Sequence, residues 1–278
     1  LASCANCSNS GTFKTWVGET SSDWDDPANW NPVGVPAICD TVLLPEAIFG
    51  RVSYYPTVNS HTAISGLIME TGSSLDLNGY NLTCDDTLHI SSANIDGGNI
   101  ILLRNINNPS IEWSNITGNT ITLENYNGSL DFYGSNFYGN TNISDAVTRT
   151  GNNNIAGNSF YGNFTLSANS TEAFAETYIS NNDPDEIYGS ATFNITTPAI
   201  FRVGNYNTLR IEGDLNLNTD IDSSLIELNE IAFRYGTNSH INQLGTTSIS
   251  IRNLFPDKYS KSQLIIPEQN IYITNRAA

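Results

Sequence analysis

Three carboxylates close together in the chain are the first residues whose types and spacing could do chemistry. Asp183, Asp185 and Glu186 lie in the polar stretch Asn-Asn-Asp-Pro-Asp-Glu. Glycosidases use two carboxyl groups about 5–10 Å apart, and clustered oxygen atoms also bind Ca²⁺. Asn, Asp and Pro equally favour an ordinary turn. We expect the turn and no catalytic residue. We keep the three carboxylates as candidate ligand-binding residues, with Ca²⁺ as the one cofactor they could hold.

Two tyrosines in a repeated phrase are the second set of candidates. The chain carries Gly-Ser-Asn-Phe-Tyr-Gly-Asn from residue 134 and Gly-Asn-Ser-Phe-Tyr-Gly-Asn from residue 157. Neighbouring residues in a strand point to opposite faces. We therefore expect Phe137 and Phe160 to face the core and Tyr138 and Tyr161 to face solvent. Outward tyrosines at matching places in successive repeats would form a strip, and their aromatic faces could stack on glycans.

The other chemistry-bearing residues do not form a recognisable site. His61, His89 and His240 are isolated from one another and from cysteine, which gives metal catalysis little support. There is no Gly-x-Ser-x-Gly nucleophile motif and no phosphate-binding glycine loop. Asp85 and Asp86 are predicted to lie in a solvated bend.

The charge balance limits the partners that the chain can have. The 278 residues include 11 Lys and Arg, and the net charge is −17. Such a chain cannot build the cationic surface that phosphate binding requires. We therefore expect neither nucleic acid nor an anionic membrane as a partner. No apolar run approaches the length of a membrane span. The acidity suits a secreted protein, for which a glycan or a neighbouring cell surface is the expected partner.

Apolar residues spaced two apart recur along the chain and indicate the elements that must position the candidates. We identify such steps at Leu75/Leu77, Ile100/Leu102, Ile121/Leu123, Ile143, Phe164/Leu166, Phe193/Ile195, Leu215/Leu217 and Ile249/Ile251. Period-two alternation predicts short strands, and recurrence every 20–35 residues predicts a repeat architecture. We therefore predict an all-β fold, a right-handed parallel β-helix over residues 61–278. Asn and Gly would occupy its bends, and stacked Asn side chains would hydrogen-bond from coil to coil. A β-sandwich or tandem Ig-like modules are the alternative.

Residues 1–60 differ from the rest of the chain and are predicted to form an N-terminal cap. Trp16, Trp24 and Trp30 all lie in this segment. Exposed tryptophans could stack on a ligand. However, the apolar end of a solenoid must be covered, so we favour a cap that these three side chains fill.

The cysteines are predicted to be disulfide-bonded. There are four of them, Cys4, Cys7, Cys39 and Cys84. An even number in an extracellular chain favours two disulfides, whose pairing the sequence leaves open. A Zn²⁺ site would need a second close cysteine pair beside Cys4 and Cys7. We expect the disulfides to staple the N-terminal segment onto the first coils.

The N-terminal third also resembles a known group of proteins. The resemblance rests on Trp24-Asp-Asp-Pro-Ala-Asn-Trp-Asn-Pro, on Gly34-Val-Pro and on Gly72-Ser-Ser-Leu-Asp-Leu-Asn-Gly-Tyr-Asn-Leu-Thr. These stretches resemble the start of secreted adhesin-like surface proteins of the Bacteroidetes that are exported by the type IX pathway. The Phe-Tyr-Gly-Asn phrases are similar to β-helical repeats in those proteins, so the resemblance covers about residues 15–215. It implies a secreted or cell-surface location and no active site. The last ten residues do not resemble a type IX sorting domain.

The sequence therefore predicts a non-catalytic, secreted or cell-surface β-helix module for adhesion or structural display, with glycan as its ligand. We expect the chain to be part of a larger protein or assembly. One alternative is a polysaccharide-active β-helix, a lyase or glycoside hydrolase, that uses the three carboxylates above. A second alternative is a subunit that assembles into filaments or arrays.

Overall fold

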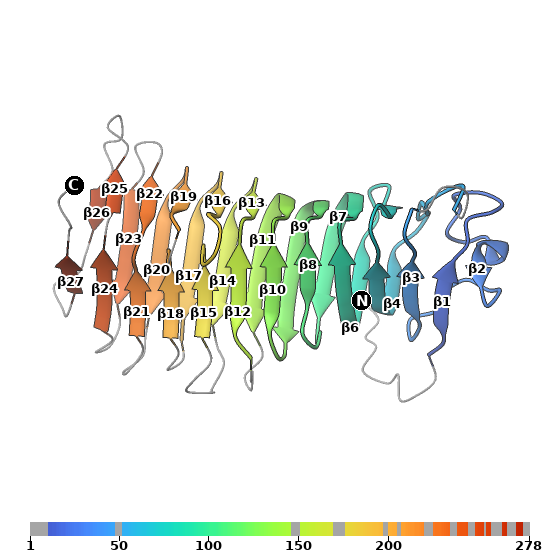
Figure 1. Cartoon of the computed structure of the whole chain (residues 1–278), viewed down its shortest axis with the longest axis horizontal. Coiled ribbons are helices and arrows are strands. Elements are labelled where there is room, and N and C mark those ends of the chain that lie inside the picture. The colour runs from blue at the N-terminus through green and yellow to red at the C-terminus, as the bar shows by residue number, and fades with distance from the viewer. Residues whose placement is uncertain are drawn as a thin grey trace.

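The strands stack in parallel, coil upon coil, so that the chain winds into an elongated β-solenoid (Figure 1). The computed structural model describes residues 11–47, 52–145, 151–168, 176–196, 200–204, 207–219, 225–233, 238–243, 248–252, 254–256, 263–265 and 271–274. The predicted parallel β-helix architecture is confirmed, and the β-sandwich alternative is wrong. Within these ranges no helix is long and apolar enough to span a membrane.

Each coil has three faces, named here A, B and C in the order in which the chain visits them. Face A holds β1 (Phe13–Trp16), β3 (Thr41–Leu44), the second half of β4 (Thr62–Met69), the second half of β6 (Leu82–Ser91), β8 (Ser110–Glu112), β10 (Leu130–Tyr133), β12 (Asn153–Ala156), β15 (Glu176–Ile179), β18 (Ile200–Val203), β21 (Leu225–Leu228), β24 (Ser248–Arg252) and β27 (Ile271–Thr274). Face B holds β5 (Ser74–Asp76), the first parts of β7 (Asn94–Arg104), β9 (Asn115–Tyr126) and β11 (Asn136–Asp145), and then β13 (Ser159–Phe160), β16 (Glu186–Ile187), β19 (Leu209–Ile211), β22 (Ile231–Phe233) and β25 (Leu254–Pro256).

Face C continues from face B within the longest strands. It holds the first halves of β4 and β6, the later parts of β7, β9 and β11, and then β14 (Phe164–Ala168), β17 (Ala191–Ile195), β20 (Leu215–Thr219), β23 (Asn238–Gln243) and β26 (Gln263–Ile265). A register shift between Tyr138 and Asn140 marks the bend between faces B and C in β11.

The core consists of columns of apolar side chains that stack in register on each face. On face A the column is Met69, Ile90, Ile111, Phe132, Ile155, Ile179, Val203 and Leu228. On face B it is Leu75, Ile95, Ile116, Phe137, Phe160, Ile187 and Ile211. On face C it is Ile64, Cys84, Leu103, Leu123, Ile143, Leu166, Phe193 and Leu217. Every member is buried, so each coil shelters the core of the next.

The apolar steps predicted from the sequence do not all belong to one column. Leu75 lies on face B and Ile249 on face A, whereas most of the other steps lie on face C. The step at Ile100/Leu102 is wrong by one residue, because Ile100 is 39% exposed and the buried residues are Ile101 and Leu103. Four apolar residues in a row cannot show which pair faces inward, and a slip of one residue exchanges the two faces.

Glycine and asparagine occupy the bends, and some of the asparagines also hydrogen-bond from one coil to the next. Gly134 and Gly157 have φ of 61° and 71°, a left-handed conformation that glycine adopts without a Cβ clash. Some asparagines adopt this conformation too, and others link the coils: Asn136 Nδ2 donates to Asn115 Oδ1 at 2.9 Å, and Asn115 Nδ2 donates to Asn94 Oδ1 at 2.8 Å. The predicted coil-to-coil bonding of asparagines is thereby confirmed for this ladder.

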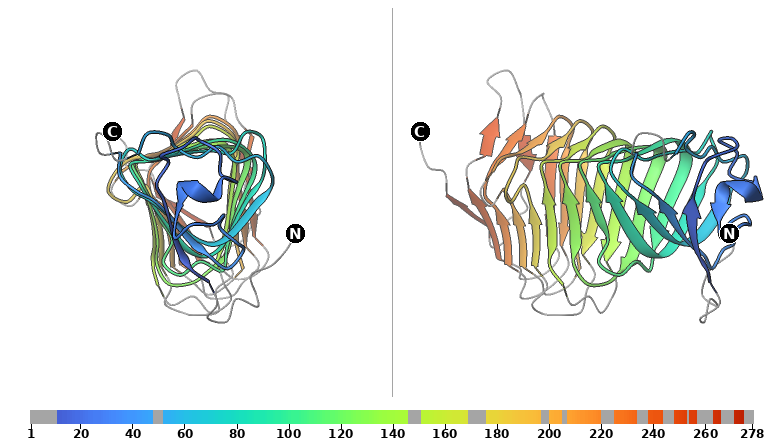
Figure 2. Two further views of the ribbon diagram at one scale, coloured as in Figure 1. Left: turned by 90° about the vertical axis from the view of Figure 1, so that its right-hand side faces the viewer. Right: turned by 45° about the vertical axis from the view of Figure 1, so that its right-hand side comes forward.

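The N-terminal segment contains a cluster of buried tryptophans. Trp30 contacts both Trp16 and Trp24 edge to face, with ring centroids 4.8 Å apart in each pair, and all three side chains are at most 2% exposed. The short 3-10 helix η1 (Pro27–Asn29) and β2 (Trp30–Asn31), antiparallel to β1, belong to the same segment. Viewed from this end, η1 lies across the middle of the coil outline (Figure 2). β1 and β3 already join the parallel ladder, and a division at residue 60 stays a prediction.

The prediction that all four cysteines form disulfides is wrong for Cys84. This residue is a buried thiol in the face C column, and its Sγ lies 3.2 Å from the carbonyl oxygen of Thr87. A small apolar side chain fits this core position between Ile64 and Leu103. Cys39 is disulfide-bonded. Cys4 and Cys7 lie outside the described residues.

Candidate functional site

Two exposed tyrosines and one half-buried tyrosine form a strip along face B. Tyr138 and Tyr161, the two predicted from the repeated phrase, are 41% and 44% exposed. Their ring centroids are 4.5 Å apart, and Tyr188 continues the stack 4.7 Å beyond Tyr161. Phe137 and Phe160, one position earlier, are completely buried. The predicted inward and outward directions are therefore confirmed, and each follows from strand alternation.

The geometry of this tyrosine strip decides what it can contact. The rings are nearly parallel, with interplanar angles of 8° and 1°, so the faces of the middle ring, Tyr161, are covered by its two neighbours. Ring edges and hydroxyl groups are what such a stack presents to a ligand. Burial raises the pKa of the Tyr138 hydroxyl, and its neighbour Tyr161 adds to the effect. The strip is thus a surface of ring edges and hydroxyl groups.

Tyr188 was missed because its repeat is degenerate. It is preceded by isoleucine rather than phenylalanine, and the surviving signal is the following glycine, Gly189, which matches Gly139 and Gly162. The Tyr188 hydroxyl donates to Glu186 Oε2 at 2.8 Å, and this hydrogen bond raises the pKa of the tyrosine to about 12.

Glu186, a predicted ligand-binding carboxylate, lies beside the strip and already has partners. In addition to accepting from Tyr188, it accepts from Arg210 Nη1 at 2.6 Å. The Arg210 side chain is 52% exposed and Glu186 is 31% exposed, so solvent screens this ion pair and its contribution to stability is small. Glu186 could still contact a ligand, in company with Tyr188 and Arg210.

Asp185 has no access to solvent and acts as a buried acceptor. Its Oδ1 accepts from the backbone N–H and the side-chain amide of Asn158, at 2.8 and 3.0 Å. Its Oδ2 accepts from the N–H and hydroxyl of Ser180, at 2.7 and 3.1 Å. Complete burial raises the pKa of Asp185 to about 6, although these four donors oppose the shift. A group that is 0% exposed cannot touch a polysaccharide, so the structure gives Asp185 a structural role.

Asp185 is the last member of a buried polar column at the bend between faces A and B. Ser114, Ser135 and Asn158 precede it in register, and each accepts from the backbone N–H of the residue one coil earlier. The column therefore satisfies backbone donors that the bend removes from the strand ladders.

Asp183 lies at the surface of the same bend. Its Oδ2 accepts a hydrogen bond from the Tyr133 hydroxyl, and its backbone oxygen accepts from the Gly157 N–H at 3.2 Å. Tyr133 in turn contacts Trp113 edge to face, with ring centroids 4.8 Å apart. Trp113 is 59% exposed and was not singled out from the sequence. Its only signal there is that it is the one tryptophan outside the N-terminal segment.

The predicted carboxylates do not gather into one acidic pair. Asp183 bonds to Tyr133, Asp185 to Asn158 and Ser180, and Glu186 to Tyr188 and Arg210. Asp85, predicted to lie in a solvated bend, is instead 6% exposed and accepts from Arg104 Nη2 at 2.9 Å. Each carboxylate thus has a local partner of its own.

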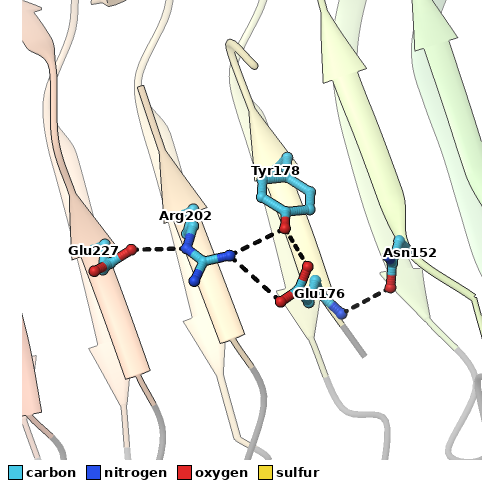
Figure 3. A network of polar contacts seen from close by, with 5 residues as sticks. All are labelled: Asn152, Glu176, Tyr178, Arg202 and Glu227. Atoms are coloured by element: carbon cyan, nitrogen blue, oxygen red, sulfur yellow. Dashed lines mark hydrogen bonds and ion pairs between the residues drawn. The ribbon is translucent and has the colours of Figure 1, made fainter. Parts of the chain in front are cut away.

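A separate polar network lies on face A, away from the predicted site (Figure 3). Arg202 Nε donates to Glu227 at 2.7 Å on one side, and its Nη1 donates to the Tyr178 hydroxyl at 3.0 Å on the other. Tyr178 donates to Glu176, whose backbone N–H reaches Asn152 Oδ1 at 3.3 Å. These side chains face outward on successive coils, and their contacts join β12's coil to β15, β18 and β21.

A shallow hollow of about 340 Å³ also opens on face A, lined in part by Glu46, Glu70 and His89. One Glu70 oxygen accepts from the backbone N–H of Glu46 at 2.9 Å. In the part of the chain that the structure describes, no three His, Cys, Asp or Glu side chains are placed to share a metal ion.

These features define the class of protein as a β-solenoid with outward polar and aromatic ladders. Comparison with known proteins goes no further, because no family model, curated protein or solved structure matches the chain.

Proposed function

We propose that this solenoid is a non-catalytic module of a secreted or cell-surface protein, used for adhesion or structural display, with glycans as its ligand class. One observation carries the proposal: exposed aromatic side chains gather on neighbouring coils. Trp113, Tyr138 and Tyr161 are 59%, 41% and 44% exposed, whereas core aromatics of the same coils are buried. Aromatic side chains with an apolar ring and a polar group in contact with solvent are typical of recognition surfaces, and so are exposed apolar patches.

The charge of the chain favours a neutral ligand. With a net charge of −17, the surface repels acidic polysaccharides as well as nucleic acids. Neutral glycans meet no such barrier, and their hydroxyl groups can donate hydrogen bonds to the carboxylates and tyrosines along face B. The resemblance to adhesin-like Bacteroidetes surface proteins supports this proposal. We also propose that the solenoid is right-handed, because parallel crossover connections nearly always take that hand.

We further propose that the tryptophan cluster and the disulfide at Cys39 cap the N-terminal end. An open solenoid end exposes apolar core and unpaired strand edges. Trp16, Trp24 and Trp30 are buried in the N-terminal segment, and η1 of the same segment lies across the middle of the coil outline (Figure 2). Reduction should lower the melting temperature by destabilising this end first, and proteolysis should then begin within residues 11–60. An unchanged melting curve and digestion pattern in reductant would contradict the staple.

A glycan array tests the function. The protein should bind at least one class of neutral glycan, and the double variant Tyr138→Ala/Tyr161→Ala should weaken binding about thirtyfold if each of the two rings contributes roughly 1 kcal/mol. The matched control is Tyr138→Phe/Tyr161→Phe, which keeps both rings and separates ring contacts from hydroxyl contacts. Circular dichroism must show that each variant keeps its β content. Failure of the unaltered protein to bind any glycan would overturn the ligand class.

A further inference from the structure

Trp113 adopts a backbone conformation that is unfavourable for a bulky residue. Its φ is 52°, in the left-handed region where a Cβ clashes with the backbone. The equivalent residues on neighbouring coils are Ser92, Gly134 and Gly157, with φ of 50°, 61° and 71°. Small residues therefore occupy this position elsewhere, and a tryptophan here has a conformational cost. Such outliers cluster at functional sites.

Burial does not explain why a tryptophan stands at this position. The side chain is 59% exposed, so most of its apolar surface gains nothing from folding. The six-membered ring of the indole lies over Gly134, whose missing Cβ would otherwise meet Trp113 Cε3 at 2.5 Å. The indole is thus held in place on one side by Gly134 and Tyr133, and the remaining surface is open to solvent.

A carboxylate is brought to the same bend by an extra loop. Six positions separate Ile179 from Asp185, whereas three separate the equivalent Ile155 and Asn158 one coil earlier. The additional residues place Asp183 over Gly157, where a Cβ would lie 3.1 Å from Asp183 Cβ. Tyr133 fixes the carboxylate by donating to Oδ2. Among the described residues none donates to Oδ1.

We propose that Trp113, Tyr133 and Asp183 form a saccharide-binding site on the bend between faces A and B. The indole takes the C–H face of a neutral pyranose, and Asp183 Oδ1 accepts a hydrogen bond from a ring hydroxyl. Tyr133 positions both groups, through its ring contact with Trp113 and its hydroxyl bond to Asp183. The inference rests on the proposed function for its ligand class, but the site is separate from the tyrosine strip.

The two aromatic surfaces differ in the part of the ring that they offer. In the strip the tyrosines cover one another's faces. Among the described residues the ring that contacts Trp113 is Tyr133, and these two rings are perpendicular, at 88°, rather than stacked. In the coil of Trp113 the position of Tyr138 is taken by Thr117, four residues along the chain, and four residues of strand span about 13 Å. One sugar residue on Trp113 therefore does not reach the strip, and the two surfaces can be tested separately.

The site variant can be chosen so that it does not harm the fold. Trp113→Gly introduces the residue that already stands at this position in the next coils, and glycine tolerates the left-handed conformation. Asp183→Ala removes the carboxylate but keeps the loop. Tyr138→Ala/Tyr161→Ala is the comparison variant: it removes the other proposed binding surface, leaves the bend intact, and shows which of the two surfaces a probe occupies.

The experiment measures binding of cellohexaose, xylohexaose, maltohexaose and chitohexaose by calorimetry and by protection of tryptophan fluorescence from iodide. Trp16, Trp24 and Trp30 are at most 2% exposed, so the quencher reports mainly on Trp113. At least one oligosaccharide should bind and protect the fluorescence. Binding should be lost in Trp113→Gly and weakened about tenfold in Asp183→Ala, as expected for loss of one charge-assisted hydrogen bond.

Each outcome decides between the site and the broader function. Binding that survives in Trp113→Gly but is lost in the tyrosine double variant overturns this site and leaves the proposed function standing. Binding that Trp113→Gly alone abolishes supports the site. If the unaltered protein binds none of the four probes and no neutral glycan on the array, both the site and the glycan-binding function are wrong.

Discussion

The inner phenylalanines and the outer tyrosines of face B are one residue apart in sequence and stack in nearly the same way. Phe137 and Phe160 have ring centroids 5.0 Å apart and an interplanar angle of 12°, and Tyr138 and Tyr161 have values of 4.5 Å and 8°. The phenylalanines are 0% exposed, whereas the tyrosines are 41% and 44% exposed. Ring geometry is therefore almost constant between the two columns, and burial is what differs.

Comparing the two columns separates two contributions to folding stability that usually occur together, the stacking of aromatic rings and their burial. Stacking of aromatic rings contributes about 0.5–1.5 kcal/mol beyond area burial, and both columns have it. Removing a whole buried ring also leaves a cavity and loses the transfer free energy of the side chain, and only the inner column has that. We infer that the inner column carries the stability of the coils, and that the outer column is free to serve recognition.

The largest effect should come from Phe160→Ala. Phe160 is 0% exposed and contacts both Phe137 and Phe164, at centroid distances of 5.0 and 4.4 Å. A buried Phe→Ala change costs about 3–5 kcal/mol of unfolding free energy. Urea denaturation followed by circular dichroism would measure the loss. Phe160→Leu is the matched control and should lose much less, because it leaves a smaller cavity. Equal losses in the two variants would contradict a cavity effect.

Asp185 in the buried polar column gives a second test, in which the pH is varied and the size of the side chain is not. The pKa of Asp185 is about 6 in the folded protein because of burial, above its ordinary value of about 3.9. Between these values the folded state binds the proton more tightly than the unfolded state. The stabilisation that comes from protonation of Asp185 is therefore complete below pH 4 and is lost as pH rises through about 6. Across this interval the change in protonation alters the unfolding free energy by about 3 kcal/mol.

Comparison with a variant isolates this group from the other carboxylates. Asp185→Asn does not titrate, so the difference in unfolding free energy between the unaltered protein and the variant should fall between pH 4 and pH 7. The variant should be less stable throughout, because its amide must present N–H groups to the donors of Asn158 or Ser180. A difference that does not change with pH would show that Asp185 is ionised over the whole interval.

The sequence was sufficient to predict the architecture and the inner and outer directions of the repeated phrase. Apolar alternation and the recurrence of Phe-Tyr-Gly-Asn both reflect the coil directly, because each coil must bury the same positions. Register was predicted less well where the pattern is ambiguous. At residues 100–103 four apolar residues follow one another, and only the bulge between faces B and C decides that Ile101 and Leu103 point inward.

The candidate site was only partly predictable, because its members come together across coils. Asp185 looked like an accessible carboxylate, but its position in register with Asn158 buries it in a column that no local pattern reveals. Trp113 and Asp183 are 70 residues apart in sequence and meet only because Tyr133 contacts both. Cys84 was assigned to a disulfide by counting cysteines, and counting does not show that its position belongs to the core of face C.

The smallest effect should come from Tyr161→Ala, the middle ring of the outer column. It removes two stacking contacts, with Tyr138 at 4.5 Å and with Tyr188 at 4.7 Å, but it leaves no buried cavity. We expect a loss of about 1 kcal/mol of unfolding free energy, measured in the same urea titration as Phe160→Ala. Tyr161→Phe keeps the stack and should be close to neutral. If Tyr161→Ala destabilises the protein as much as Phe160→Ala, the outer column is as structural as the inner one, and it would no longer be a surface set aside for recognition.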